Sequence, residues 1–286
     1  MKLYQNLLLM GAAAMMGACS SDETPEVTTG DNEIAFVCSY DNDTRATDTK
    51  FENLDKIGVY MTEQDIPLQL GGNELNNEQF GYNGSAWTAA RKVYWNNGMH
   101  NVYAYYPYST EVNDIQEYTF DVATDQSTHE KYTASDFLWA NKTGVEASAS
   151  PVSLKFSHRM SKAVVRLEKG DDYEGQIPGD CEVYIHSTVG TAMIDLSTGG
   201  VEKDPYAGTV SIHANKVSNT EFQAIVVPQN IESRRPIVEV VTSGVSYLME
   251  GKISFRQGYS HAIIVTLSKN PTQTKIEIGG SIGGWN

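Results

Sequence analysis

The sequence lacks an apolar run long enough to cross a membrane permanently. Its most apolar stretches are Leu7–Met10 and Ala12–Met16, whereas a spanning helix needs about 20 apolar residues. Basic residues are also scarce, with 21 Lys and Arg against 36 Asp and Glu and a formal net charge of −15. An acidic surface repels phosphate backbones and anionic lipid, so nucleic acid is not an expected partner.

Motifs for metal binding or catalysis are absent as well. There is no Cys-x-x-Cys pair, and the six histidines are scattered without the spacing of metal ligands. Gly279–Gly283 matches the Gly-x-Ser-x-Gly pattern of hydrolases, but only three residues follow it, whereas a nucleophile elbow needs a helix and downstream Asp and His. We therefore expect no catalytic residue, no metal site and no cofactor, and we do not expect an enzyme.

The N-terminus carries the features of an export signal. Lys2 precedes the short apolar run, and Gly17 and Ala18 stand directly before Cys19. Small residues before a cysteine suit a lipoprotein signal peptidase, so residues 1–18 are expected to be removed after Ala18, and Cys19 to receive a lipid. The alternative is an ordinary signal peptide that happens to contain a cysteine.

Residues 19–32 are expected to form an acidic, polar tether. Ser20–Glu23 resembles a signal for export to the outer leaflet, although a plain solvated tether fits equally well. Beyond Cys19, two cysteines remain, Cys38 and Cys181. An exported protein could pair them, but the sequence leaves this open, with two free thiols as the alternative.

The remaining apolar segments are short, aromatic or β-branched, and bounded by Gly, Asn, Asp or Pro, which is typical of strands. We find no convincing helix after the leader, and no internal repeat. A stretch of small residues at 141–151 suggests a domain boundary. We therefore expect an all-β protein with two antiparallel β-sandwich domains, residues 33–150 and 151–286, the second beginning with a strand at Val152–Phe156.

Several short motifs, taken in order, resemble the fimbrillin-like proteins of anaerobic Gram-negative bacteria, which are lipoprotein precursors of type V pilus subunits and related surface proteins. The motifs are Thr44–Ala46, Phe51–Tyr60, Val102–Tyr108, Asp125–Ser127, Ser135–Ala140 and Leu154–Met160. The resemblance implies two tandem transthyretin-like domains on a lipoprotein of the outer membrane surface or of a fimbrium. It also implies other fimbrial subunits as partners, the outer membrane as a partner through the lipid on Cys19, and a surface ligand on a host or bacterium.

The resemblance further implies a route of assembly. An Arg-specific protease would cut between Arg45 and Ala46, the first strand would be displaced, and a donor strand from another subunit would take its place. The alternative for Arg45 is an ordinary surface arginine. A monomeric surface lipoprotein that binds a glycan or host ligand is the alternative function, suggested by tyrosines at positions 103, 105, 106 and 108.

Two segments have the side-chain alternation that such an exchange needs. One face of the first strand is formed by Ile34, Phe36, Cys38 and Tyr40. Near the C-terminus, one face of an extended segment is formed by Ile276, Ile278 and Ile282. The first segment could equally be a permanent strand, and the second could be the last strand of its own sandwich.

Overall fold

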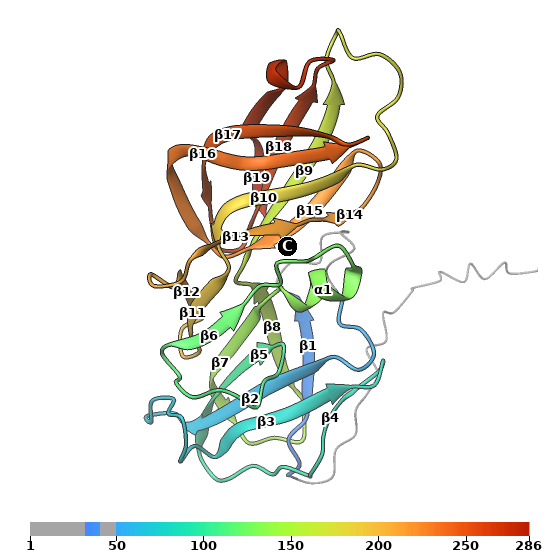
Figure 1. Ribbon diagram of the computed structural model, residues 1–286. Helices are drawn as coiled ribbons and strands as arrows, with labels where there is room; N and C mark the ends of the chain where they lie inside the picture. The colour runs from blue at the N-terminus through green and yellow to red at the C-terminus, as the bar shows by residue number, and fades with distance from the viewer. Residues whose placement is uncertain (1–31, 41–49, 286) are drawn as a thin grey trace, which may run out of the picture.

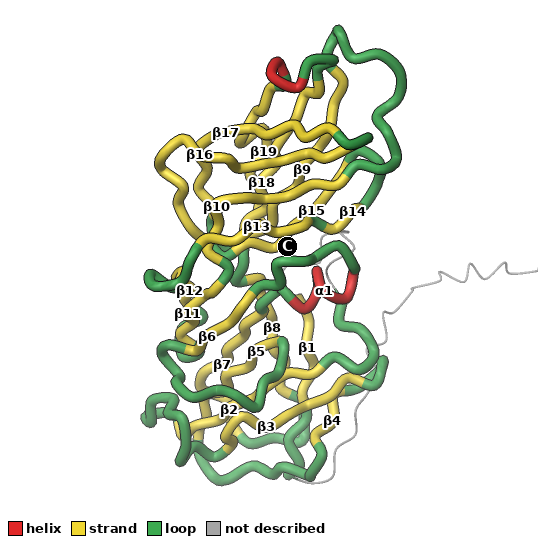
Figure 2. The backbone as a smooth tube through the Cα atoms, in the orientation of Figure 1, coloured by secondary structure: helices red, strands yellow, loops and turns green. Residues whose placement is uncertain are grey.

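The computed structural model describes residues 32–40 and 50–285, and strands dominate throughout (Figure 2). The all-β prediction is confirmed. The expected signal peptide, the tether up to residue 31 and the segment 41–49 lie outside the described residues, and with them Ala18, Cys19, Arg45 and Ala46.

A seven-stranded sheet forms the N-terminal part of the molecule, in the strand order β1-β8-β7-β5-β2-β3-β4 (Figure 1). Its strands are β1 (Phe36–Tyr40), β2 (Lys56–Glu63), β3 (Leu75–Tyr82), β4 (Trp87–Ala89), β5 (Met99–Tyr106), β7 (Leu138–Glu146) and β8 (Val152–His158).

An interior strand of this sheet, β2, is buried on both faces. Ile57 and Val59 belong to the core under one face, whereas Tyr60 belongs to the core on the other. Gly58 is required between them, because a Cβ atom there would lie 2.3 Å from the ring of Tyr105.

Two further sheets form the C-terminal part and contribute to one hydrophobic core, one ordered β13-β10-β16-β17 and the other β14-β15-β9-β18-β19. The strands are β9 (Ser161–Lys169), β10 (Glu182–Val189), β13 (Thr209–His213), β14 (Asn215–Lys216), β15 (Glu221–Val226), β16 (Gln229–Thr242), β17 (Val245–Phe255), β18 (Tyr259–Leu267) and β19 (Lys275–Gly284).

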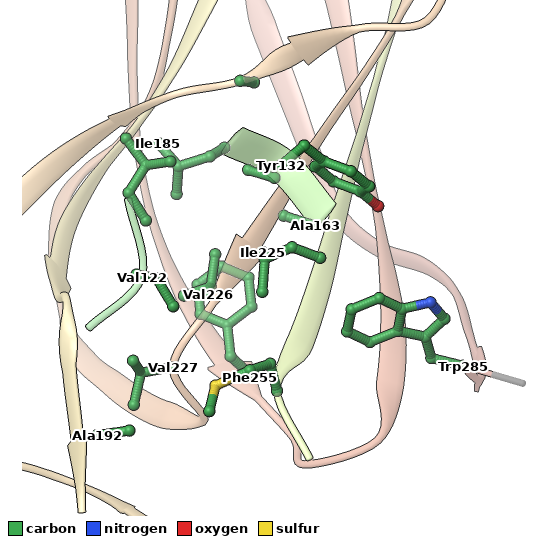
Figure 3. Packing of buried hydrophobic residues seen from close by; sticks show 14 of the residues in the cluster. Val122, Tyr132, Ala163, Ile185, Ala192, Ile225, Val226, Val227, Phe255 and Trp285 are labelled. Carbon is green, nitrogen blue, oxygen red and sulfur yellow. The ribbon is translucent and has the colours of Figure 1, made fainter. Parts of the chain in front are cut away.

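A small three-stranded sheet ties the two parts together. In it, β11 (Thr191–Asp195) pairs with β12 (Gly200–Lys203) on one side and with β6 (Tyr118–Asp121) on the other. The larger core accordingly runs through the junction, containing Tyr105 as well as Ile263. Figure 3 shows part of this packing around Val226 and Phe255.

The strand expected to open the second domain lies instead in the first sheet. β8 pairs antiparallel with β7 and parallel with β1, so the seven-stranded sheet continues to His158, past the boundary expected at residue 150. The small residues at 141–151 belong to the end of β7 and a short connection to β8. Their composition suggested a linker because turns and linkers use the same residue types.

The expectation of no helix after the leader was wrong. A helix, α1 (His129–Ala134), begins after Thr128, whose hydroxyl accepts a hydrogen bond from the amide of Lys131, and buries only Tyr132. A single 3₁₀ turn, η1 (Pro271–Gln273), precedes β19. Helices of about one turn are too short to show the 3.6-residue periodicity that sequence reading relies on.

Candidate functional site

The first strand lies at the edge of its sheet. Within the described residues, β1 pairs with β8 alone, in parallel, with Phe36 opposite Val152 and Tyr40 opposite Phe156. On its other side the chain entering β1 makes a short contact with residues 93–95, through Ile34 N–H to Val93 O at 2.9 Å and Trp95 N–H to Asn32 O at 3.0 Å.

The inner face of this segment fills the core of the N-terminal sheet. Ile34 and Phe36 are buried, at 4% and 2% exposure. Cys38 and Tyr40 are half-buried against the same cluster, whereas Val37 points outward with 37% exposure. The Phe36 ring meets Phe80 edge-on at 4.9 Å. Removing this segment would therefore open an apolar trough beside unpaired backbone groups of β8.

Both remaining cysteines are free thiols. Burial raises the pKa of the Cys38 thiol, which therefore stays neutral and weakly reactive at physiological pH. Cys181 is buried in the larger core. Since one thiol belongs to each of the two clusters, both act as small apolar side chains.

The C-terminal strand, β19, is also an edge strand. It pairs antiparallel with β18, with Ile276 opposite Val265 and Ile278 opposite Ile263. Both isoleucines are partly buried against the C-terminal core. Gly251 leaves room for Ile278, since a Cβ atom at Gly251 would lie 2.5 Å from Ile278 Cδ1. The side chain of Ile282 lies outside the described residues. The structure therefore places the donor-strand candidate in its own sheet, which is the alternative that the sequence left open.

Trp285, directly after β19, is anchored against the N-terminal sheet. Its indole is 4% exposed and stacks on His158 with 4.0 Å between ring centroids. The imidazole Nδ1 lies 2.6 Å from Asp136 Oδ2, and the ring also contacts Tyr40 at 5.5 Å. The end of β1 and the end of the described chain thus both contact one histidine. Asp136 and His158 both lie within motifs of the sequence, but nothing in the sequence signalled that His158 stacks on Trp285.

The tyrosines considered as a ligand platform do not form an exposed surface. Tyr105 is 1% exposed, and its hydroxyl bonds to Asn77 and to the Ser109 carbonyl. Tyr103, Tyr106 and Tyr108 are half-buried. Burial raises the pKa of both Tyr105 and Tyr106, so these hydroxyls stay protonated and act as structural hydrogen-bond groups.

Across residues 32–40 and 50–285, no three His, Cys, Asp or Glu side chains gather closely enough to hold a metal ion. The helices in these ranges are too short or too polar to cross a membrane. The geometry that remains is that of two edge strands, one at each end of the described chain. β1 packs against one hydrophobic cluster, and β19 packs against the other, which also contains Trp285.

Comparison with known proteins identifies the family. A family model described as fimbrillin-like matches residues 44–285. A protein of Bacteroides ovatus provisionally named fimbrium tip subunit Fim1C is 28% identical over 235 residues, covering 72% of this chain but 43% of that protein. One of Bacteroides uniformis, provisionally named fimbrium subunit Fim1C, is 27% identical over 236 residues, covering 80% of this chain and 76% of that protein. The chain therefore spans less than half the length of the first of these relatives.

Solved structures share the fold. The crystal structure of a candidate cell adhesion protein from Bacteroides ovatus superposes with a TM-score of 0.71 at 22% identity, covering 89% of this chain and 97% of that one. Another candidate cell adhesion protein, from Bacteroides uniformis, gives 0.70 at 19% identity, covering 90% of this chain and 100% of that one. With the family match over most of its length, the chain belongs to the fimbrillin-like family.

Proposed function

We propose that this protein is a subunit of a cell-surface fimbrium, exported as a lipoprotein through Cys19 and assembled by strand exchange after cleavage between Arg45 and Ala46. The observation that carries this proposal is the position of β1, an edge strand with buried side chains that precedes Arg45 in the chain. The family assignment and the named relatives support a fimbrial role.

The energetics favour exchange over simple loss of the strand. Burying one large apolar side chain stabilises a fold by about 1.5–3 kcal/mol, and the segment buries almost all of Ile34 and Phe36. Its loss would also leave backbone partners such as the Val93 carbonyl and the Val152 amide without protein bonds. An open trough beside a free strand edge recruits another extended chain by strand addition.

For the donor, the proposal assigns β19 of a neighbouring subunit. Its partly buried Ile276 and Ile278 have the alternation of Ile34 and Phe36, and Ile282 continues that parity. As an edge strand bonded to β18 alone among the described strands, β19 can leave its sheet without breaking two ladders.

The test is to incubate the purified chain with an Arg-specific protease. We expect a new N-terminus at Ala46 followed by elongated, SDS-resistant polymers, and we expect Arg45→Ala to abolish both. Arg91→Ala is a matched control, because the Arg91 side chain is 67% exposed and, among the described residues, its ion pair is with Glu78. Polymer formation by Arg45→Ala at the rate of the unmodified chain would refute the processing step.

A further inference from the structure

Side chains from both strands of the proposed exchange contact one histidine, His158. Tyr40 is the last residue of β1, and Trp285 directly follows β19. The centroid of the His158 ring lies 5.5 Å from that of Tyr40 and 4.0 Å from that of Trp285. The strand that cleavage would remove and the strand that a neighbour would receive therefore share a contact residue.

His158 is fixed in place by the part of the chain that cleavage would leave intact. Its ring is buried, at 3% exposure, and its Nδ1 lies 2.6 Å from Asp136 Oδ2. Both residues follow Arg45 in the chain. Removal of β1 therefore leaves the histidine and its carboxylate partner behind, but takes away the ring of Tyr40.

The docking of Trp285 holds the end of β19. Its backbone amide donates to the Gly258 carbonyl at 2.8 Å, and its indole stacks on His158 with 9° between the ring planes. The ammonium group of Lys162 lies 5.0 Å from the centre of the indole. Figure 3 shows the indole pointing inward from the edge of the larger core. Since Trp285 directly follows β19, the strand cannot leave its sheet completely until these contacts break.

Tyr40 also helps to shield the docked indole from water. Tyr40, Asp136 and Trp285 line the same small cavity at the junction of the two parts. Loss of Tyr40 removes one wall of this cavity together with one aromatic contact of His158. Water then reaches the edge of the stack between His158 and Trp285, which weakens it because the stack is stabilised by burial of both rings.

We propose that Tyr40 couples removal of β1 to release of β19. While Tyr40 is present, Trp285 stays docked on His158; when Tyr40 leaves with β1, the equilibrium of Trp285 shifts toward an undocked state. The proposal rests on the strand exchange proposed above and adds an order of events to it. A subunit releases its own donor strand after its own groove has opened, so the uncleaved chain keeps β19 in place.

The test is hydrogen exchange of the Trp285 backbone amide in the uncleaved chain, because the bond to Gly258 must open before this amide exchanges. Tyr40→Ala and Tyr40→Leu should both speed the exchange about three- to tenfold, the population shift expected for one aromatic contact. Tyr40→Phe keeps the ring and is the matched control, with an unchanged rate. The Leu196 amide, bonded to the Ile115 carbonyl at 2.7 Å in the same core, should exchange equally in all four chains.

Two results would overturn the coupling. One is an unchanged Trp285 rate in both Tyr40→Ala and Tyr40→Leu, and the other is an equal acceleration of Trp285 and Leu196, which would mean a general loss of stability. Failure of strand exchange gives a different result. Polymers that form after cleavage, with a Trp285 rate indifferent to Tyr40, would leave strand exchange standing and refute the coupling. Faster Trp285 exchange in Tyr40→Ala, without polymers after cleavage of the unmodified chain, would support the coupling and refute strand exchange.

Discussion

Phe36→Ala tests whether the first strand is held by its buried side chains and then discarded. Phe36 is 2% exposed and meets Phe80 edge-on. Truncation of a buried phenylalanine costs about 3–5 kcal/mol, through lost transfer energy and the cavity left behind. We expect a value near the lower end, about 3 kcal/mol, because β1 is an edge strand and β8 can relax toward the gap.

The assay is urea unfolding of the uncleaved chain, followed by tryptophan fluorescence, since Trp87 and Trp95 report from the same core as Phe36. Val37→Ala is the matched control, because Val37 is the next residue of β1 but is 37% exposed. It should change the free energy of unfolding by less than about 0.5 kcal/mol. Equal effects of the two substitutions would refute the assignment of Phe36 to the core.

The same substitution separates the uncleaved chain from the assembled form. If residue 36 is removed before assembly, polymers made from the Phe36→Ala chain should resist denaturant as well as unmodified polymers do. A loss of about 3 kcal/mol per subunit in the polymer as well, the cost of a truncated core phenylalanine, would show that β1 stays in place and would contradict strand exchange.

Three further substitutions or conditions test other parts of the structure. Burial lowers the pKa of His261, so the stability gained from its neutral imidazole is complete above about pH 6.5 and is lost as pH falls through the folded-state pKa. The drop in the free energy of unfolding between pH 7 and pH 5 should therefore be smaller in His261→Gln than in the unmodified chain. An equal drop in the two chains would refute this. Gly58→Ala should destabilise the fold by about 2–3 kcal/mol, measured by calorimetry, because the new Cβ atom would clash with Tyr105. Gly81→Ala is the control and should have little effect, because a Cβ atom at Gly81 would meet no neighbour within 4 Å. Equal melting temperatures for the two variants would contradict the packing around Gly58. Cys38 and Cys181 should both alkylate slowly in the native chain and rapidly in urea, and a fast-reacting Cys38 at pH 8 would contradict its raised pKa.

Local patterns in the sequence predicted the class of fold but not its pairing. The alternation of Ile34, Phe36, Cys38 and Tyr40 is visible in the sequence, because side chains on a strand repeat every two residues. Its partner is not: β8 begins more than 110 positions after β1 and pairs in parallel, and only the global packing selects it. β3 has no clear apolar alternation in the sequence, because half of its residues, among them Asn76 and Gln79, are Asn, Glu or Gln.

The burial of Trp285 was also beyond the reach of sequence reading. Trp285 follows a glycine-rich end that resembles a loose terminus, and its stacking on His158 depends on how the two parts meet. The contact of His158 with both Tyr40 and Trp285 likewise exists only in three dimensions.

The central claim is that the segment containing β1 is removed during assembly. The most direct measurement is the N-terminal residue of this protein in fimbriae isolated from cells. The account predicts Ala46. Intact subunits that begin at a lipidated Cys19 within the polymer would contradict it.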